Sequence, residues 1–343
     1  MPQDHALNLK PEAGTMPLMA IQPFTGPQAW TRSTVAEADW RIAIGEEALA
    51  ELVSVAETLR RNPIEMLLLT DRSFDLPACR ALMADVKAIL DEGVMFVVLD
   101  RLPLDEISKD EARQLYWILT SLMSQPVAQR FNGAMTFDVL DRKVAVLPGS
   151  GIRPTVTNAD LTFHNDNSYN SPQPDYIGLL CLGTPVSGGT SKIASVYSVH
   201  NALLARFPEV LPRLYRPFYY DRYREHAEGE SGIAELPVLA FDGERLSTRI
   251  AIPEIVAGYK LAGIEMDEET KAAIDALRAV FADPEMFAEF QMERGQIQIA
   301  NNRNALHSRG DFVDSEDASN RRHLVRLWLR NCGSRSYTGI GAE

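Results

Sequence analysis

Residues 160–168 read DLTFHNDNS, a short alternation of apolar and polar side chains with a histidine and an aspartate two positions apart. Successive side chains of a β-strand point to opposite faces, so Thr162, His164 and Asp166 would share one face. The apolar residues that alternate with them would anchor the other face in the core. An imidazole and a carboxylate on one face can occupy neighbouring positions around a metal ion. The stretch therefore predicts a core strand that carries part of a metal site.

A His-x-Asp pair is weak evidence by itself, because the composition of this chain gives about 0.4 such pairs by chance. A second histidine from a distant strand would strengthen it, since two histidines and one carboxylate form the ligand set of non-haem Fe(II) sites. His307 is the best candidate, because it follows an alternating segment and lies in a turn-rich stretch, where a rigid sheet often positions ligands. His5, His200 and His226 are more simply explained by solvation or local hydrogen bonds.

Composition excludes several classes of protein. The chain has 343 residues, 45% of them hydrophobic, which is enough for a sizeable core. Its net charge of −13 opposes binding to nucleic acid at long range. No apolar run approaches the roughly 20 residues of a membrane span, and the N-terminus lacks the features of a secretory signal, so we expect a cytoplasmic protein without a membrane partner. Three cysteines far apart argue against a disulfide framework or a zinc ribbon.

The N-terminal third of the chain is predicted to be mainly helical, and the remainder is predicted to contain many short strands. Apolar residues at helical spacing predict helices at 47–61, 78–90 and 109–122, with a buried strand at 93–99. After about residue 131, β-rich runs separated by turns predict strands at 161–164, 176–182, 191–196, 236–241, 245–252, 296–300 and 323–329. Asp242-Gly243 indicates a hairpin. Two helices interrupt these strands, at 198–207 with Ser198 as its N-cap and at 267–293.

This order of elements predicts an α+β protein with a mainly β core, since many short strands at such spacing favour a sandwich or barrel. Residues 1–90 would form an N-terminal arm and a helical flank, and the arm is irregular because residues 1–33 are rich in proline and glycine. Residues 91–343 would form the core, with a helical insert at about 265–293. We expect both parts to form one integrated domain.

Two arginines four positions apart, Arg322 and Arg326, lie on the last predicted strand and would face the same side. A guanidinium group matches a carboxylate with two parallel hydrogen bonds, so two of them on one face favour an anionic partner. Surface salt bridges are the alternative explanation. The position of both arginines shortly after His307 favours the anion-binding interpretation.

The motifs taken together, in their order along the chain, resemble one family. They are His164-x-Asp166, Gly188-Gly189-Thr190, Asn301-Asn302-Arg303-x-x-x-His307-Ser308-Arg309 and Arg322-x-x-x-Arg326. Over roughly residues 90–331 the chain is similar to the taurine dioxygenase and clavaminate synthase group of Fe(II)- and 2-oxoglutarate-dependent oxygenases. The resemblance implies a double-stranded β-helix, or jelly roll, flanked by helices. Two positions depart from the family's usual residues: Asn165, often threonine, and Ser308, often glycine. We expect Asn165 to point away from the metal.

The resemblance also implies roles for individual residues. The metal ligands would be His164, Asp166 and His307. Thr190 and Arg322 match the positions that hold the distal carboxylate of 2-oxoglutarate, and Arg326 matches one that contacts an anionic group of the substrate. Halogenating relatives have a small residue in place of the carboxylate ligand, so Asp166 argues against a halogenase. Segments 150–160 and 218–223 are candidates to line or cover the pocket, although ordinary aromatic packing explains the second equally well.

The implied activity is that of an oxygenase with Fe(II), 2-oxoglutarate and O2 as cofactors. It would oxidise an unactivated C–H bond, most simply by hydroxylation, in a small carboxylate-bearing molecule such as an amino acid, and release succinate and CO2. The same cofactors could support desaturation, epoxidation or ring formation. A cupin-type metalloenzyme without 2-oxoglutarate is a second class, which leaves Thr190 and Arg322 unexplained. A member that binds a ligand without turnover is a third, which the complete ligand set disfavours.

Overall fold

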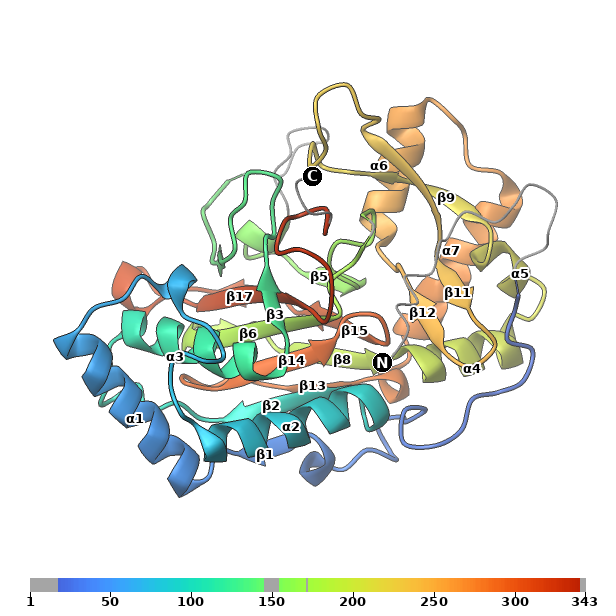
Figure 1. Ribbon diagram of the computed structural model, residues 1–343. Helices are drawn as coiled ribbons and strands as arrows, with labels where there is room; N and C mark the ends of the chain where they lie inside the picture. The colour runs from blue at the N-terminus through green and yellow to red at the C-terminus, as the bar shows by residue number, and fades with distance from the viewer. Residues whose placement is uncertain (1–17, 145–153, 171, 340–343) are drawn as a thin grey trace.

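The structure is a computed structural model that describes residues 18–144, 154–170 and 172–339 (Figure 1). Its helices are α1 (Glu46–Arg61), α2 (Pro77–Glu92), α3 (Lys109–Met123), α4 (Val196–Arg206), α5 (Leu211–Leu214), α6 (Ile252–Ala262) and α7 (Glu268–Phe281). Its strands are β1 (Arg41–Ala43), β2 (Phe96–Asp100), β3 (Gln125–Val127), β4 (Phe137–Val139), β5 (Leu161–His164), β6 (Tyr176–Gly183), β7 (Ser187–Gly188), β8 (Ser191–Ser195), β9 (Pro217–Asp221), β10 (Ile233–Pro237), β11 (Leu239–Phe241), β12 (Leu246–Thr248), β13 (Ala288–Phe290), β14 (Ile297–Asn301), β15 (Ala305–Arg309), β16 (Phe312–Val313) and β17 (His323–Arg330). The chain is thus an α+β protein, as predicted.

Two sheets organise the β part of the described chain. The larger sheet has the order β1-β2-β14-β6-β17-β3, with β4 also paired to β17. The smaller has four strands in the order β13-β8-β15-β5, and all of its pairs are antiparallel. Neighbours in both sheets come from distant parts of the sequence, so long-range pairing brings the predicted motifs together.

The larger sheet is buried on both faces because its strands carry continuous apolar runs. On β2, Val97 and Leu99 pack with residues of α1, α2 and α3, which cover one face of the sheet (Figure 1). The alternate residues, Phe96 and Val98, join a second core that also contains Phe163 of the smaller sheet. The period of two along a strand therefore produces one core under the helices and another shared with the smaller sheet.

Side chains just before α3 and α7 cap the first backbone N–H groups of these helices. The Ser108 hydroxyl accepts from the Glu111 backbone N–H before α3, and the Glu111 carboxylate accepts from the Ser108 N–H, which makes a reciprocal capping box. Asp267 caps α7 by accepting from the Thr270 N–H at 2.7 Å. The predicted N-cap Ser198 is wrong, because α4 begins earlier and Ser195 accepts from the Ser198 N–H.

Two other predicted boundaries are wrong. The helix expected at 267–293 ends at Phe281, where Asp283-Pro284 interrupts it, and residues 288–290 form β13. The strand expected at 245–252 is shorter, because β12 ends at Thr248 and α6 begins at Ile252. The hairpin prediction is confirmed, since Asp242-Gly243 connects the antiparallel pair β11 and β12.

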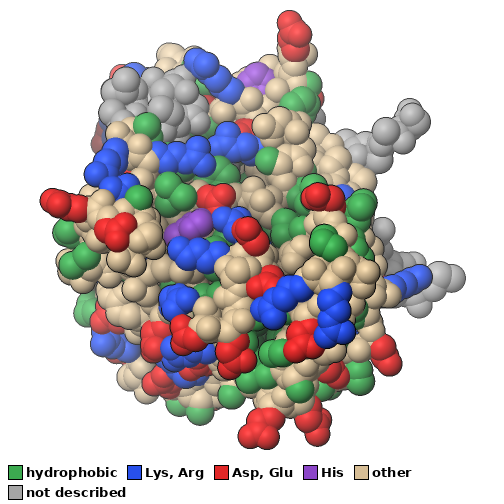
Figure 2. All heavy atoms as spheres, turned by 90° about the vertical axis from the view of Figure 1, so that its left-hand side faces the viewer, with side chains coloured by type: hydrophobic (Ala, Val, Ile, Leu, Met, Phe, Trp, Pro, Cys, Tyr) green, Lys and Arg blue, Asp and Glu red, His purple; other side chains and the backbone are tan. Residues whose placement is uncertain are grey.

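Further features concern the cysteines, the helix lengths and the surface charges. Cys79, Cys181 and Cys332 are all free thiols, the first two buried and the third exposed. None of the helices in the described segments is long and apolar enough to cross a membrane. On the face shown in Figure 2, acidic and basic side chains are interspersed. The first half of the predicted arm, residues 1–17, and the start of the segment 150–160 lie outside the described residues.

Candidate metal centre

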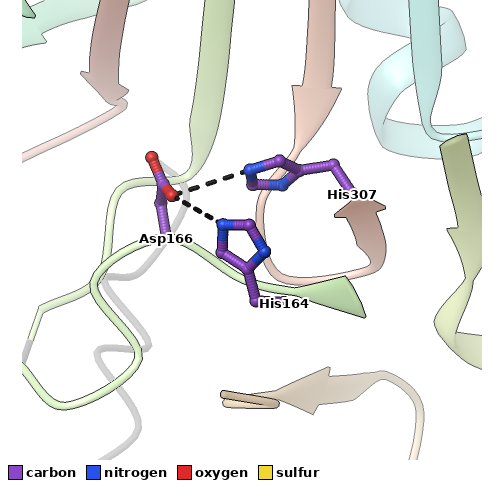
Figure 3. Close-up of side chains that lie close together, drawn as sticks. All are labelled: His164, Asp166 and His307. Carbon is purple, nitrogen blue, oxygen red and sulfur yellow. Dashed lines mark ion pairs between the residues drawn. The ribbon is translucent and has the colours of Figure 1, made fainter. Parts of the chain in front are cut away.

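The smaller sheet brings the three predicted metal ligands together (Figure 3). His164 is the last residue of β5, Asp166 lies in the turn that follows, and His307 is in the middle of β15. β5 and β15 are antiparallel neighbours, and His307 lies directly opposite His164 in their register. His307 is therefore on a strand rather than in the loop that the sequence suggested.

The geometry of this triad fits a single metal ion. Oδ1 of Asp166 lies 3.5 Å from Nε2 of His164 and 3.6 Å from Nε2 of His307. One ligand atom from each residue lies within 4.8 Å of the other two. Nδ1 of His164 is 2.8 Å from the Thr162 carbonyl, so it is placed to donate its proton there and leave Nε2 free as a ligand. Two imidazoles and one carboxylate form the set that suits Fe(II).

Electrostatics favour the metal-binding forms of His307 and Asp166. Burial opposes protonation of His164, but its hydrogen bond to Asp166 and the charge of that carboxylate raise its pKa. Burial, together with the neighbouring His164 imidazole, lowers the pKa of His307 to about 3, so the His307 imidazole is neutral near pH 7. Burial opposes ionisation of Asp166, but the Arg326 guanidinium and the His164 imidazole hold its pKa well below the usual range. A neutral imidazole and an ionised carboxylate are the ligand forms required.

The second oxygen of Asp166 is held by its neighbours on β17. Oδ2 accepts a hydrogen bond from Nε1 of Trp328 at 2.6 Å and forms an ion pair with Nη1 of Arg326 at 2.9 Å. Arg326 is itself fixed, because its Nε donates to Oε1 of the fully buried Gln129 at 2.8 Å. These contacts leave Oδ1 directed at the two imidazoles. Trp328 and Gln129 had no predicted role.

The turn that carries Asp166 is fastened to the chain just before β15. The Asp166 N–H donates to Oδ1 of Asn302 at 2.8 Å, and Nδ2 of Asn302 donates to the Asp166 carbonyl at 2.9 Å. Asn302 is fully buried. Because this reciprocal pair joins the segment of one ligand to the segment that leads to His307, it fixes the distance between them.

A small cavity that borders the triad is lined by arginines and by no carboxylate among the described residues. Its lining includes His307, Ser191, Gln298, Arg309 and Arg322. Both arginines are buried, and Nη1 of Arg322 and Nε and Nη1 of Arg309 have no hydrogen-bond partner among the described residues. Burial lowers the pKa of Arg322 to about 10 and that of Arg309 to about 9, so both are charged near neutral pH. Buried charged donors without partners call for an anion.

The structure brings Arg322 into this cavity but not Thr190. The Thr190 hydroxyl accepts a hydrogen bond from Nε2 of Gln291 at 2.7 Å, and Thr190 is not part of the lining. Its neighbour Ser191 lines the cavity and lies opposite Arg309 in the register of β8 and β15. Residues directly opposite in an antiparallel pair share a face, and a shift of one position reverses the face. Ser191 and Arg309 were missed because this register becomes known only when β8 is paired with β15.

A second cavity, of about 110 Å³, also borders the triad and shares His164 and Arg326 with the first. Besides His164 and Asp166, its lining includes Thr155, Asp160, Tyr169, Tyr223, Pro253, Glu254, Arg326 and Trp328. The described part of the segment 150–160 thus contributes to a pocket wall. Only part of segment 218–223 lines the pocket: Tyr223 belongs to the cavity lining, whereas Phe218 and Tyr220 are buried in the hydrophobic core.

The site and the β architecture define a class of enzyme, the non-haem iron oxygenases. Comparison with known proteins identifies the family: residues 65–328 match the model of the taurine catabolism dioxygenase TauD, TfdA family, and the chain belongs to this family. It is a non-haem iron, 2-oxoglutarate-dependent dioxygenase, and its cofactors are Fe(II), 2-oxoglutarate and O2.

Individual relatives agree with this assignment. The chain is 27% identical to FR-33289 synthase of Streptomyces rubellomurinus over 312 residues, which cover 90% of each protein. It is 26% identical to L-asparagine oxygenase of Streptomyces coelicolor over 194 residues, 55% of this chain and 53% of that protein.

Solved structures show the same fold. Asparagine oxygenase in complex with Fe(II), 2S,3S-3-hydroxyasparagine and succinate superposes with a TM-score of 0.62 at 19% identity, over 85% of this chain and 93% of that one. The non-haem iron oxygenase OrfP with iron and alpha-ketoglutaric acid gives a TM-score of 0.62 at 16% identity, over 84% of this chain and 94% of that one.

Proposed function

We propose that this dioxygenase hydroxylates an unactivated C–H bond of a small carboxylate-bearing molecule, an amino acid being the best match. We also assign its two sheets to a double-stranded β-helix, the fold implied by the resemblance. When bound, Fe(II) with 2-oxoglutarate and O2 supplies the oxidation, with succinate and CO2 as coproducts. The observation that carries the proposal is that two cavities border the triad, one lined by arginines without a carboxylate and the other lined by both arginine and carboxylate side chains.

In this proposal the metal ligands are His164, Asp166 and His307, and the positive cavity binds 2-oxoglutarate. Arg322 and Arg309 would hold the distal carboxylate, because their unpartnered N–H groups lie in a cavity lined by no carboxylate among the described residues. Ser191 would contribute its hydroxyl. We assign to Ser191 the carboxylate contact expected of Thr190, because the Thr190 hydroxyl accepts a hydrogen bond from Gln291 and Thr190 does not line the cavity.

The second cavity would hold the substrate. It contains carboxylate and guanidinium groups, Glu254 and Arg326, beside aromatic walls formed by Tyr169 and Tyr223. A zwitterion such as an amino acid matches this pair of charges, and the aromatic walls exclude water from the reacting bond. Arg326 stays the proposed contact for a substrate anion, although its Nη1 already pairs with Asp166. The substrate class agrees with the hydroxyasparagine and hydroxyarginine complexes named for the structural relatives.

Family membership excludes the cupin-type alternative that does not use 2-oxoglutarate. Desaturation, epoxidation and ring formation use the same cofactors, and the product distinguishes them. A screen of amino acids for substrate-dependent succinate release tests the proposal, with mass spectrometry of the product. We expect one amino acid to stimulate succinate release and to gain one oxygen atom. The amino-acid class would be contradicted if no amino acid raised succinate release above the rate measured without substrate, while a carboxylic acid that lacks the amine did raise it.

A further inference from the structure

Asn165 lies between two metal ligands in sequence, but its side chain points away from the metal and is 2% exposed. Its Nδ2 donates to the carbonyls of Asn302 at 2.7 Å and Ala305 at 3.3 Å. Its Oδ1 accepts from the Thr248 hydroxyl at 2.8 Å and from the Ile250 N–H at 2.9 Å. Both amide protons and both acceptor positions are therefore in use, although the side chain is almost completely buried.

The backbone of Asn165 strengthens one of these connections. Its N–H donates to the Ile250 carbonyl at 2.9 Å, so Asn165 and Ile250 form a reciprocal pair. Threonine, which the resembling family often has here, offers a single donor on a shorter side chain. It cannot replace both pairs of contacts at once. Asparagine at this position thus makes a connection that threonine could not make in full.

The two sides of Asn165 lead to different parts of the active site. Asn302 and Ala305 belong to the segment that enters β15 and places His307. The other side, at residues 248–250, leads directly into α6, whose first turn contributes Pro253 and Glu254 to the proposed substrate cavity. The amide of Asn165 is therefore a buried bridge between the metal-ligand segments and one wall of that cavity.

We infer that Asn165 is a positioning residue that couples metal binding to the order of the substrate-cavity wall at residues 246–254. A metal ion that fixes the turn of His164 and Asp166 also fixes the amide between them. The amide in turn fixes residues 248–250 and the start of α6. Coupling of this kind needs a continuous chain of contacts between the metal site and the cavity wall. It is reciprocal, so order in the cavity wall should in turn favour metal binding. The inference rests on the proposed function only where it treats this cavity as the substrate site.

Hydrogen–deuterium exchange of the full chain with and without Ni²⁺ tests the coupling directly. Ni²⁺ binds such a site and needs neither O2 nor 2-oxoglutarate. In the unchanged protein we expect Ni²⁺ to slow exchange in peptides covering 246–254 by at least about fivefold, the lower end of typical coupling between sites. In Asn165→Thr this slowing should be lost, while calorimetry shows that the metal still binds.

Matched variants separate coupling from general destabilisation. Asn201→Thr is the control, because Asn201 makes a similar reciprocal pair with the Phe24 backbone, 2.8 Å in each direction, away from the triad. It should keep the Ni²⁺ effect at 246–254. If Asn165→Thr does not fold, Thr248→Val removes one donor to the same amide and should reduce the effect, whereas Thr248→Ser should retain it.

Two results would overturn the inference. One is metal binding to the unchanged protein without slower exchange at 246–254. The other is equal slowing in the unchanged protein, Asn165→Thr and Thr248→Val. Neither result depends on catalysis. A protein that shows the coupling but forms no complex with 2-oxoglutarate would refute the proposed function and leave the role of Asn165 intact.

Discussion

The indole Nε1 of Trp328 donates a hydrogen bond to Oδ2 of Asp166 across 2.6 Å, at the side of the carboxylate that faces away from the two imidazoles. Nη1 of Arg326 forms an ion pair with the same oxygen at 2.9 Å. Both residues come from β17, so the last strand of the larger sheet orients a proposed ligand in the turn that follows β5 of the smaller sheet. The metal site therefore depends on contacts between the sheets as well as on its three ligands.

Trp328→Phe should weaken metal binding by about tenfold or more, because outer contacts to a ligand typically contribute that much to affinity. The change keeps the aromatic packing and removes only the donor to Asp166. Trp117→Phe is the matched control, since Trp117 is equally buried and its Nε1 donates to the Leu69 carbonyl, far from the ligands. Fe(II) titration under anaerobic conditions measures both variants. Equal metal affinities in the two variants would show that the hydrogen bond does not support the ligand.

Arg322→Ala should raise the 2-oxoglutarate concentration for half-saturation by at least about tenfold, because a charge-assisted hydrogen bond in a buried site is lost. Arg213→Ala serves as the control. Arg213 is also a buried arginine, but it binds the hydroxyls of Thr270 and Tyr259. That variant should lose stability without a change in 2-oxoglutarate affinity. Unaltered half-saturation in Arg322→Ala would remove the assigned role of the positive cavity.

Ser191→Ala should raise the same half-saturation concentration by about two- to tenfold, the range expected for one neutral hydrogen bond. Thr190→Val should leave it unchanged, because the Thr190 hydroxyl binds Gln291 outside the cavity. Titration of the two variants side by side measures the difference. The opposite order of effects would restore the original assignment to Thr190.

That His164, Asp166 and His307 lie together could be predicted from sequence, because a local pattern and the order of the motifs point to these three residues. His164 and Asp166 were found from their spacing, although Asp166 lies in a turn and not on the strand. Its orientation comes from Asn302 and Trp328, which are distant in sequence. Arg309 lay within a recognised motif but received no role, since its place opposite Ser191 depends on the pairing of β8 with β15.

The helix α6 was missed for a local reason. Proline and glycine usually interrupt helices, and α6 contains Pro253 and Gly258. Pro253 is compatible with a first turn, where its missing N–H has no helical partner. Gly258 allows close packing on β9, because a Cβ there would lie 2.4 Å from the Tyr219 carbonyl oxygen. Tertiary contact therefore explains a residue that looks like a helix breaker in sequence.

Stability should fall between pH 6.5 and pH 4 partly because of His200. Its side chain is fully buried beside the Tyr215 hydroxyl, and burial lowers its pKa from the ordinary 6.5 to about 4. Above pH 6.5 it is neutral in both states and contributes no pH dependence. As the pH falls, the unfolded state takes up the proton first, so folding loses about 3 kcal/mol by pH 4.

His200→Gln keeps a polar side chain next to Tyr215 but cannot titrate. Urea unfolding at pH 7 and pH 5 measures the free energy of unfolding of both proteins. The unchanged protein should lose more stability over this interval than the variant, because other titrating groups are common to both. An identical loss would show that His200 is protonated equally in the folded and unfolded states.

The central claim is that His164, Asp166 and His307 hold an Fe(II) ion to which 2-oxoglutarate binds beside Arg322 and Arg309. Anaerobic addition of Fe(II) and then 2-oxoglutarate tests it most directly, since the complex of the two has a weak charge-transfer band in the visible region. We predict that the band appears with the unchanged protein and is absent from His307→Ala. Protein that has bound Fe(II) but shows no band at saturating 2-oxoglutarate would contradict the claim.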